Sequence, residues 1–313
     1  MRIGFAAPVS GSWATRPNLV RVARRAEELG YHSLWTFQRL LAPLDASWGE
    51  PYRSVHDPVV TLSYLAGVTR RIRLGVAVLN LPFFSPVLLA KQLATLDIVS
   101  EGRLDVGLGI GWSAEEFAAV GVDPRGRGRR AEEFVAALRT LWTDDEVEHE
   151  GEFYRVPRTR MEPKPVQRPH PPILLGAKAE PALRRAGRIA DGWISSSSAD
   201  LSTIGDSIAL IRAAAAEAGR DAVRLRFVCR GPVRVRAAGA RDRRPLTGSF
   251  DEIRGDLAVL ADQGVTEVFV DLNFDPEIGS PDADPEESMR RAELALTELA
   301  PSQEPNQLAA SSR

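Results

Sequence analysis

Residues 72–79 read Ile72-Arg73-Leu74-Gly75-Val76-Ala77-Val78-Leu79, a run in which one arginine and one glycine interrupt apolar residues. A short, nearly continuous apolar run is typical of a strand in a parallel sheet that is covered on both faces. Seven further β-rich segments are spaced along the chain. They cover Arg2–Ala7, Ser33–Phe37, Leu104–Leu108, Ile173–Gly176, Gly192–Ser196, Val223–Val228 and Glu267–Leu272.

Amphipathic helices alternate with these strands. The first begins at Pro17, carries an apolar face from Leu19 to Leu29 and stops at Gly30. Other helix starts show a capping residue before a proline or a capping box, at Asp57-Pro58, Ser85-Pro86, Asp284-Pro285 and Ser249 with Glu252. Strands that alternate with helices favour a (β/α)8 TIM barrel with insertions. An open, doubly wound sheet is the alternative.

The chain is expected to form one domain. Residues 1–300 make the barrel, with an insertion at about 144–172 that contains a proline-rich crossover from Glu150 to Pro172. The crossover includes a short strand-like piece at Phe153–Val156. The polar tail, residues 301–313, shows no periodicity, and we expect it to be disordered.

The composition excludes several classes of function. The formal net charge of −2 argues against a nucleic-acid partner. The single cysteine, Cys229, leaves no disulfide framework, and its apolar surroundings indicate a packed thiol. The histidines lack metal-ligand spacing, so we expect no metal site. No apolar run is long enough for a signal peptide or a membrane helix, so we expect a cytoplasmic protein with no membrane contact.

In a parallel barrel the reacting groups lie where the strands end. The glycine-rich segment Gly107–Gly111 lacks the spacing of a dinucleotide fingerprint. It either lets a flat ring approach the backbone closely or forms a structural tight turn. Gly176-Ala177-Lys178 precedes a helix start near Pro181, where free amides and the helix dipole can bind a phosphate. An ordinary turn with a solvated lysine is the alternative.

Two arginine-rich runs, 125–130 and 241–244, interrupt the pattern. Each could hold a polyanionic group, and each could equally be a solvated loop, which is the more frequent meaning of such runs.

These segments, taken in order, resemble the luciferase-like monooxygenase family, and within it the branch that uses the deazaflavin coenzyme F420. The resemblance covers roughly Arg2 to Leu299. It rests on Leu34-Trp35-Thr36, on the run from Arg71 through Asp97, on Glu101–Leu104 leading into Gly107–Trp112, and on Glu162–Gln167, His170–Ile173 and Ala190–Trp193.

The resemblance implies a cofactor ring against the end of the third strand, with a non-proline cis peptide behind it at Ala77–Val78. It places ring and side-chain contacts on Asn80, Gly109, Gly111 and Ser195. The phosphate loop of the family maps onto Gly176, Ala177 and Lys178.

One departure bears on the reaction. Deazaflavin-dependent sugar and alcohol dehydrogenases of the family end the second strand in Asp-His and place a glutamate after the fourth-strand glycines. This chain has Gln38-Arg39 and Trp112 there. Arginine does not release its proton near neutral pH, so Arg39 cannot act as a base, but it can bind a carboxylate or polarise a carbonyl. A salt bridge at the barrel rim, to Asp45 or Glu50, is the structural alternative.

The hypothesis is therefore an F420-dependent oxidoreductase that moves a hydride between C5 of the deazaflavin and a small organic substrate, as a reductase rather than an alcohol dehydrogenase. Arg39 and Gln38 face the substrate, and His56 is a candidate proton donor, or else an ordinary loop residue. An FMN-dependent monooxygenase that uses molecular oxygen is the second hypothesis. A non-catalytic flavin-binding barrel is the third, and the family resemblance suggests a homodimer.

Overall fold

The structure, a computed structural model, describes residues 1–45 and 47–301. In this part of the chain, eight parallel strand positions form a closed barrel, because β3 pairs with both β2 and β5. The tail that we expect to be disordered, residues 301–313, lies outside the described residues except for Pro301. The barrel strands are β1 (Arg2–Ala6), β2 (Ser33–Thr36), β3 (Arg73–Val76) continued by β4 (Leu79–Asn80), β5 (Leu104–Gly109), β8 (Ile173–Gly176), β9 (Gly192–Ile194), β10 (Arg226–Pro232) and β13 (Glu267–Asp271).

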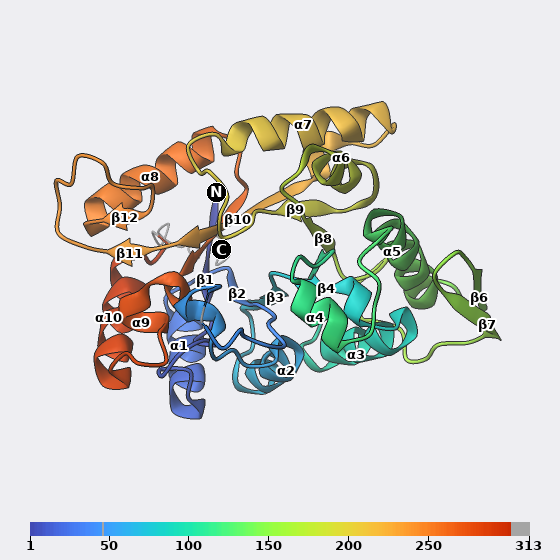
Figure 1. The fold of residues 1–313 in the computed structure, drawn as a ribbon, viewed down its shortest axis with the longest axis horizontal. Coiled ribbons are helices and arrows are strands. Elements are labelled where there is room, and N and C mark those ends of the chain that lie inside the picture. Colours follow the sequence, from blue (N-terminus) through green and yellow to red (C-terminus); the bar gives the residue numbers. More distant parts are fainter. Residues whose placement is uncertain (46, 302–313) are drawn as a thin grey trace, which may run out of the picture.

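Helices follow the strands and cover the barrel from outside (Figure 1). They are α1 (Arg16–Glu28), α2 (Pro58–Val68), α3 (Pro86–Val99), α4 (Ala114–Ala119), α5 (Arg127–Thr143), α6 (Glu180–Ile189), α7 (Ile204–Glu217), α8 (Phe250–Asp262), α9 (Pro276–Gly279) and α10 (Pro285–Glu298). The (β/α)8 barrel predicted from the sequence is thereby confirmed. In the described residues, no helix is both long and apolar enough to cross a bilayer.

The predicted capping residues mostly act as caps. Asp57 and Asp284 each accept a hydrogen bond from a backbone amide of the first turn that follows them. Ser249 and Glu252 form the reciprocal capping box. Ser85 occupies the capping position of α3, but its hydroxyl makes no capping hydrogen bond. The proline at the first turn of α3 therefore starts that helix without side-chain help.

Two strand boundaries differ from the prediction. Residues 222–224 form a 3₁₀ turn, held by the Asp221 side chain that accepts from the amide of Val223, and β10 begins only at Arg226 and runs to Pro232. The segment predicted as one strand over residues 72–79 is two strands, β3 and β4. They are separated by Ala77–Val78, whose peptide bond is cis, as the resemblance implies.

The insertion before β8 contains an antiparallel hairpin, β6 (Val147–Glu150) with β7 (Arg155–Thr159), at the edge of the molecule beside α5 (Figure 1). The strand-like piece predicted at Phe153–Val156 overlaps β7. Asp97 of α3 fixes the far end of the insertion, since its carboxylate accepts from the amides of Val166 and Gln167 and from the Gln167 side chain at 2.7–2.9 Å.

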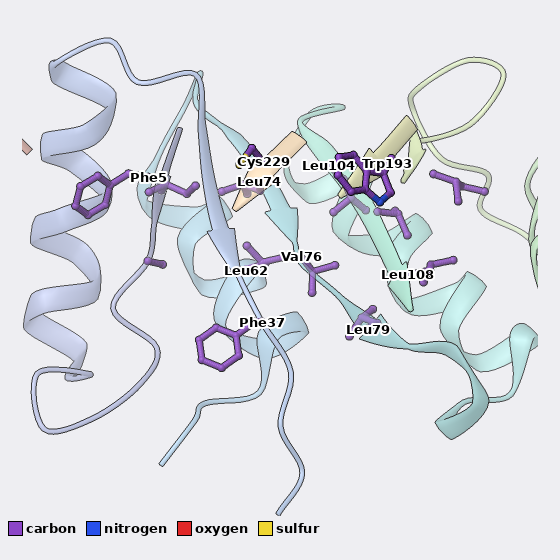
Figure 2. Packing of buried hydrophobic residues seen from close by; sticks show 14 of the residues in the cluster. Phe5, Phe37, Leu62, Leu74, Val76, Leu79, Leu104, Leu108, Trp193 and Cys229 are labelled. Carbon is purple, nitrogen blue, oxygen red and sulfur yellow. The ribbon is translucent and has the colours of Figure 1, made fainter. Parts of the chain in front are cut away.

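Outward-facing strand residues pack against the helices in one apolar cluster (Figure 2). Phe5, Leu74, Val76 and Leu108 of the strands are completely buried in it. Cys229 also belongs to this cluster, and burial raises the pKa of its thiol to about 12. The prediction of a packed thiol is confirmed.

Inward-facing residues form layers across the barrel, as the period of two along each strand requires. The middle layer is apolar and centres on Trp35 stacked on Phe269, with ring centroids 5.2 Å apart. Gly75 lies beside this pair. A Cβ at that position would come within 2.5 Å of the Trp35 ring, so the close approach requires glycine. The layer separates charged groups at the two ends of the barrel.

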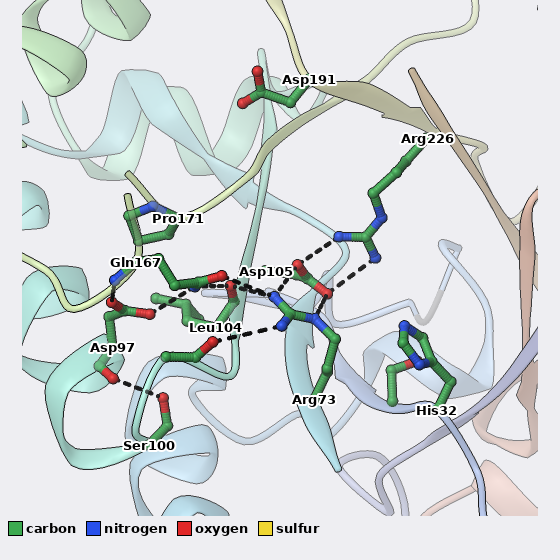
Figure 3. Close-up of polar contacts among 12 residues, drawn as sticks. His32, Arg73, Asp97, Ser100, Leu104, Asp105, Gln167, Pro171, Asp191 and Arg226 are labelled. Carbon is green, nitrogen blue, oxygen red and sulfur yellow. Dashed lines mark hydrogen bonds and ion pairs between the residues drawn. The ribbon is translucent and has the colours of Figure 1, made fainter. Parts of the chain in front are cut away.

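The N-terminal end is closed by a charge network (Figure 3). Asp105 accepts two hydrogen bonds from Arg73 and two from Arg226, at 2.6–3.0 Å, and Arg226 also binds Glu267 at 3.0 Å. Burial opposes ionisation of Asp105, but Arg226 and Arg73 outweigh it and lower the pKa of this carboxyl to about 2. The second Glu267 oxygen accepts from Ser33 and Trp35. Every oxygen of the two carboxylates has a partner.

Candidate active site

A cavity of about 220 Å³ opens at the C-terminal ends of the strands. It brings together residues of β4, β5, β8, β9 and β10 and residues of the segments that follow β2, β5, β8 and β9. Every sequence-predicted site residue except His56 lines it, namely Gln38, Arg39, Ala77, Val78, Asn80, Gly109, Gly111, Gly176, Ala177, Lys178 and Ser195. Their contact with a cofactor stays a prediction.

The side chain of Val78 lies against two neighbouring strands, β5 and β8. A Cβ on Gly109 of β5 would lie 2.5 Å from Val78 Cγ2, and one on Gly176 of β8 would lie 3.0 Å from Val78 Cγ1. Gly111 adopts a left-handed conformation, with φ of +71°. Gly109 therefore leaves space for the Val78 side chain, called here the Val78 bulge. Gly111 forms the tight turn.

Asn80 lies beside the bulge and is 3% exposed. Its backbone amide donates to Gln38 Oε1 at 2.8 Å, so Gln38 fixes the end of β4. The Asn80 Nδ2 amide has no hydrogen-bond partner in the described part of the chain. A buried donor without a partner costs free energy, so this amide is ready to bind a carbonyl oxygen of a ligand in the cavity.

Arg39 lies in an aromatic box. Its guanidinium is 4.8, 5.4 and 5.6 Å from the ring centroids of Trp112, Tyr52 and Trp48. Its Nε donates to the carbonyl oxygen of Gln38 at 2.8 Å. Burial lowers the pKa of Arg39, and the charge of Glu116 opposes this shift. The group remains a cation at neutral pH.

The acidic partner of Arg39 is Glu116 of α4, rather than Asp45 or Glu50. Arg39 Nη1 lies 3.4 Å from Glu116 Oε2, and neither of these two atoms makes a hydrogen bond with a described residue. Glu116 is 0% exposed, and its Oε1 accepts from the amide of Leu40 at 2.7 Å. Glu116 was not among the site residues predicted from the sequence. Its signal is the capping pattern from Ser113 to Glu116, in which the Ser113 hydroxyl caps the helix while the glutamate reaches the segment after β2.

Arg230 is the second site residue that was not predicted from the sequence, because the seventh strand was predicted to end at Val228. Its Nη2 donates to the carbonyl oxygen of Ala77 at 2.5 Å, across the barrel and directly before the cis bond. Its Nε lies 3.4 Å from Asp271 Oδ2, and its guanidinium is 5.0 Å from the Phe37 ring. Burial raises the pKa of Asp271, and the charge of Arg230 counteracts this.

His56 lies away from the cavity. It sits between a 3₁₀ turn and the start of α2, and its backbone amide donates to the carbonyl oxygen of Val9 at 2.9 Å. The titratable side chains that line the cavity, within the described residues, are Arg39, Tyr52, Lys178 and Arg230. No carboxylate or imidazole is among them. In the same part of the chain, no three acidic, His or Cys residues are grouped so that they could hold a metal ion.

The predicted phosphate loop forms one side of the cavity. Lys178 Nζ donates to Ser198 Oγ at 3.3 Å, and Ser198 Oγ lies 3.0 Å from Ser196 Oγ. Helix α6 begins at Glu180, and the residue before it, Ala179, provides no side-chain cap. The arrangement combines a cation, hydroxyl groups and helix amides, which suits an anionic group.

A closed parallel barrel with a cavity at the carboxyl ends of its strands defines a (β/α)8-barrel enzyme. A family model described as luciferase-like monooxygenase matches residues 2–267. The chain belongs to the luciferase-like monooxygenase family, and it is an F420- or flavin-dependent oxidoreductase.

Two relatives illustrate this membership. An uncharacterized protein of Mycobacterium tuberculosis is 36% identical over 211 residues, which cover 64% of this chain and 74% of that protein. An FMNH2-dependent dimethylsulfone monooxygenase of Pseudomonas putida is 35% identical over 202 residues, which cover 64% of this chain and 53% of that enzyme.

Two solved structures share the fold. The monooxygenase RslO1 from Streptomyces bottropensis superimposes with a TM-score of 0.77 at 26% identity, over 96% of this chain and 98% of that one. An F420-dependent secondary alcohol dehydrogenase, solved with an F420-acetone adduct, gives a TM-score of 0.76 at 16% identity over the same shares. The latter likeness shows the fold alone.

Proposed function

We propose that this chain is an F420-dependent reductase of a small, electron-poor organic substrate. The observation that carries the proposal is the charge of the cavity. Arg39 and Arg230 line it with side chains that are each 7% exposed, and no carboxylate or imidazole among the described residues does. Oxidation of an alcohol needs a base at the reacting oxygen, whereas reduction of a polarised double bond needs a cation near the developing negative charge.

The residues present fit a flavin-type cofactor. The unpartnered Asn80 amide suits a ring carbonyl, and the Val78 bulge supports a flat ring from behind. Lys178 with the serines suits a phosphate. When bound in its reduced form, F420 would supply the hydride from C5 and would be oxidised in the same step, and the protein would supply positioning and electrostatics.

Each side chain then has a defined task. Arg39 binds a carboxylate of the substrate or polarises its carbonyl, and Trp112 and Tyr52 surround it with aromatic surface that excludes water. Arg230 holds the carbonyl oxygen of Ala77 and so fixes the bulge. Glu116 anchors the segment after Arg39 through the amide of Leu40. A proton for the substrate comes from water or from Tyr52 in this scheme.

An FMN-dependent monooxygenase is the second candidate. It is favoured by the relative at 35% identity, which is named for its dependence on FMNH2. Both cofactors contain a tricyclic ring and a phosphate, so the same cavity residues serve either. A cytoplasmic location and a homodimeric state belong to the proposal as well, and size-exclusion chromatography with light scattering tests the latter.

The test is a titration of the purified protein with F420 and with FMN, each oxidised and reduced, followed by fluorescence and calorimetry. F420 is expected to bind at least tenfold more tightly than FMN, a difference of about 1.4 kcal/mol. Equal affinities, or FMN alone copurifying with the protein, would reject the deazaflavin in favour of the monooxygenase.

A further inference from the structure

A second cavity of about 430 Å³, called here the arginine groove, adjoins the active-site cavity. It lies between the segment after β9 and the segment that carries β11 (Arg234–Val235) and β12 (Thr247–Gly248). Ser197 lines both cavities. A ligand that leaves the active-site cavity past Ser197 therefore enters the arginine groove. The residues of the groove used below are Ser197, Ser198, Asp200, Arg234, Arg244 and Thr247.

Four of the five arginines of this segment divide into two kinds. Arg236 binds Asp275 at 2.7 Å, and Arg243 binds Asp256 at 2.5 Å, so both serve the fold. Arg234 and Arg244 line the groove and form no ion pair with any described residue. Among the described residues, the side chain of Arg234 donates to the carbonyl oxygen of Phe274, at 3.3 Å. Of the three arginines in the run at 241–244, Arg243 serves the fold, Arg244 lines the groove, and Arg241 is exposed and does not line it.

The other groups of the groove favour an anion. Ser197, Ser198 and Thr247 contribute hydroxyls, and Lys178 reaches Ser198 from the side of the active-site cavity. The groove contains one carboxylate, Asp200. That carboxylate already accepts from the amide and the hydroxyl of Ser202, at 2.9 and 2.6 Å. Counting Lys178, three cations stand against one acid along this path.

We propose that the arginine groove binds a chain of carboxylates that extends out of the active-site cavity, and that this chain is the acidic oligoglutamate tail of F420. The inference rests on the proposed function. A flexible chain of carboxylates matches a row of cations and hydroxyls at least partly open to solvent, because each group needs only a local charge or donor and no fixed shape. An acidic substrate offers the same chemistry, and the experiment separates the two sources.

The experiment compares the affinity of F420 with a single glutamate and F420 with a long tail, by quenching of cofactor fluorescence. The proteins are wild type, Arg244→Gln, the double variant Arg234→Gln/Arg244→Gln and the control Arg241→Gln. Arg241 is exposed in the same segment and does not line the groove. Two exposed ion pairs are together worth about a tenfold change in affinity. The long tail should therefore tighten binding to wild type and to the control by about this factor, and to the double variant hardly at all.

Raising the salt concentration should remove the advantage of the long tail, since exposed charges are screened. A wild type that binds both forms equally, or a double variant that keeps the tail dependence, overturns the groove as a tail site and leaves the proposed function intact. If the double variant instead weakens the binding of an acidic substrate alone, the groove belongs to the substrate. Failure of both deazaflavins to bind overturns the proposed function, which is a different result.

Discussion

The two ends of the barrel both contain buried ion pairs, yet their geometry differs. At the N-terminal end, Asp105 lies 2.6–3.0 Å from the nitrogens of Arg73 and Arg226, and all its lone pairs are used. At the C-terminal end, Arg39–Glu116 and Arg230–Asp271 are each 3.4 Å apart. An atom of each of these four residues has no hydrogen-bond partner among the described residues.

This difference in geometry indicates that the ion pairs at the N-terminal end stabilise the fold, whereas those at the C-terminal end belong to the functional site. A buried charge costs free energy unless hydrogen bonds compensate it, so the closed network at the N-terminal end holds the strands together. At the C-terminal end the pairs are longer, and the arginine of each pair lines the cavity while its carboxylate partner, Glu116 or Asp271, is fully buried and does not. Substitutions at the two ends should therefore differ in what they damage.

Asp105→Asn should have the largest effect. It leaves Arg73 and Arg226 without their shared carboxylate, and breaking a buried pair in this way costs about 3–5 kcal/mol. Urea unfolding measures the loss. Asp145→Asn is the matched control, because Asp145 is exposed, and it should change the free energy of unfolding by less than about 0.5 kcal/mol. A loss below about 1 kcal/mol for Asp105→Asn would refute the structural role. If the variant does not fold, Arg73→Gln, which keeps Arg226, replaces it.

The free energy of unfolding that Asp105→Asn loses relative to wild type should depend on pH. The pKa of Asp105 is about 2 in the folded protein, below the value of about 3.9 for an unfolded aspartate. The ionised carboxylate therefore stabilises the fold above about pH 4, and this contribution is lost as the pH falls towards 2. The stability difference between wild type and Asp105→Asn should be full above pH 4 and narrow below it. A difference that does not change between these values would contradict the assignment of the shift to Asp105.

Arg39→Ala should reduce turnover by about 10²-fold, the usual loss for a donor to developing charge, while the affinity for the cofactor stays nearly constant. Arg39→Lys should recover only part, since a point charge cannot reproduce the planar fork. Arg39→Ala also leaves the buried Glu116 without its cationic partner, so a control must separate this loss of stability from the loss of turnover. The double variant Arg39→Met/Glu116→Gln should restore the melting temperature without restoring turnover. Normal turnover per folded molecule in Arg39→Ala would make this arginine structural.

Gly176→Asp should have the smallest of these effects, a weakening of cofactor affinity by about tenfold. It places a carboxylate where the phosphate is expected. Any Cβ there also approaches Val78 Cγ1 to 3.0 Å, so Gly176→Ala is needed to separate bulk from charge. Titration with F420 measures both variants. If Gly176→Asp binds as Gly176→Ala does, the phosphate lies elsewhere.

Local sequence signals predicted the strands and the residues that follow them, because apolar runs, glycines and caps act over a few residues. They did not show the third-strand break at Ala77–Val78, which only the family resemblance indicated. Arg230 was missed because the 3₁₀ turn at residues 222–224 shifts β10 toward the C-terminus. The pairing of Arg226 with Asp105 was also out of reach, since it depends on closure of the barrel between distant strands.

The apolar middle layer also determines where this enzyme can be engineered. A Cβ on Gly75 would touch the Trp35 ring, and one on Gly107 would come within 1.9 Å of a strand carbonyl oxygen. Neither position tolerates randomisation, because the barrel itself would have to expand. Trp112 is 55% exposed at the cavity, and the segment 40–44 beside Arg39 carries further exposed leucines. Libraries confined to that rim can change the accepted substrate while the barrel keeps its shape.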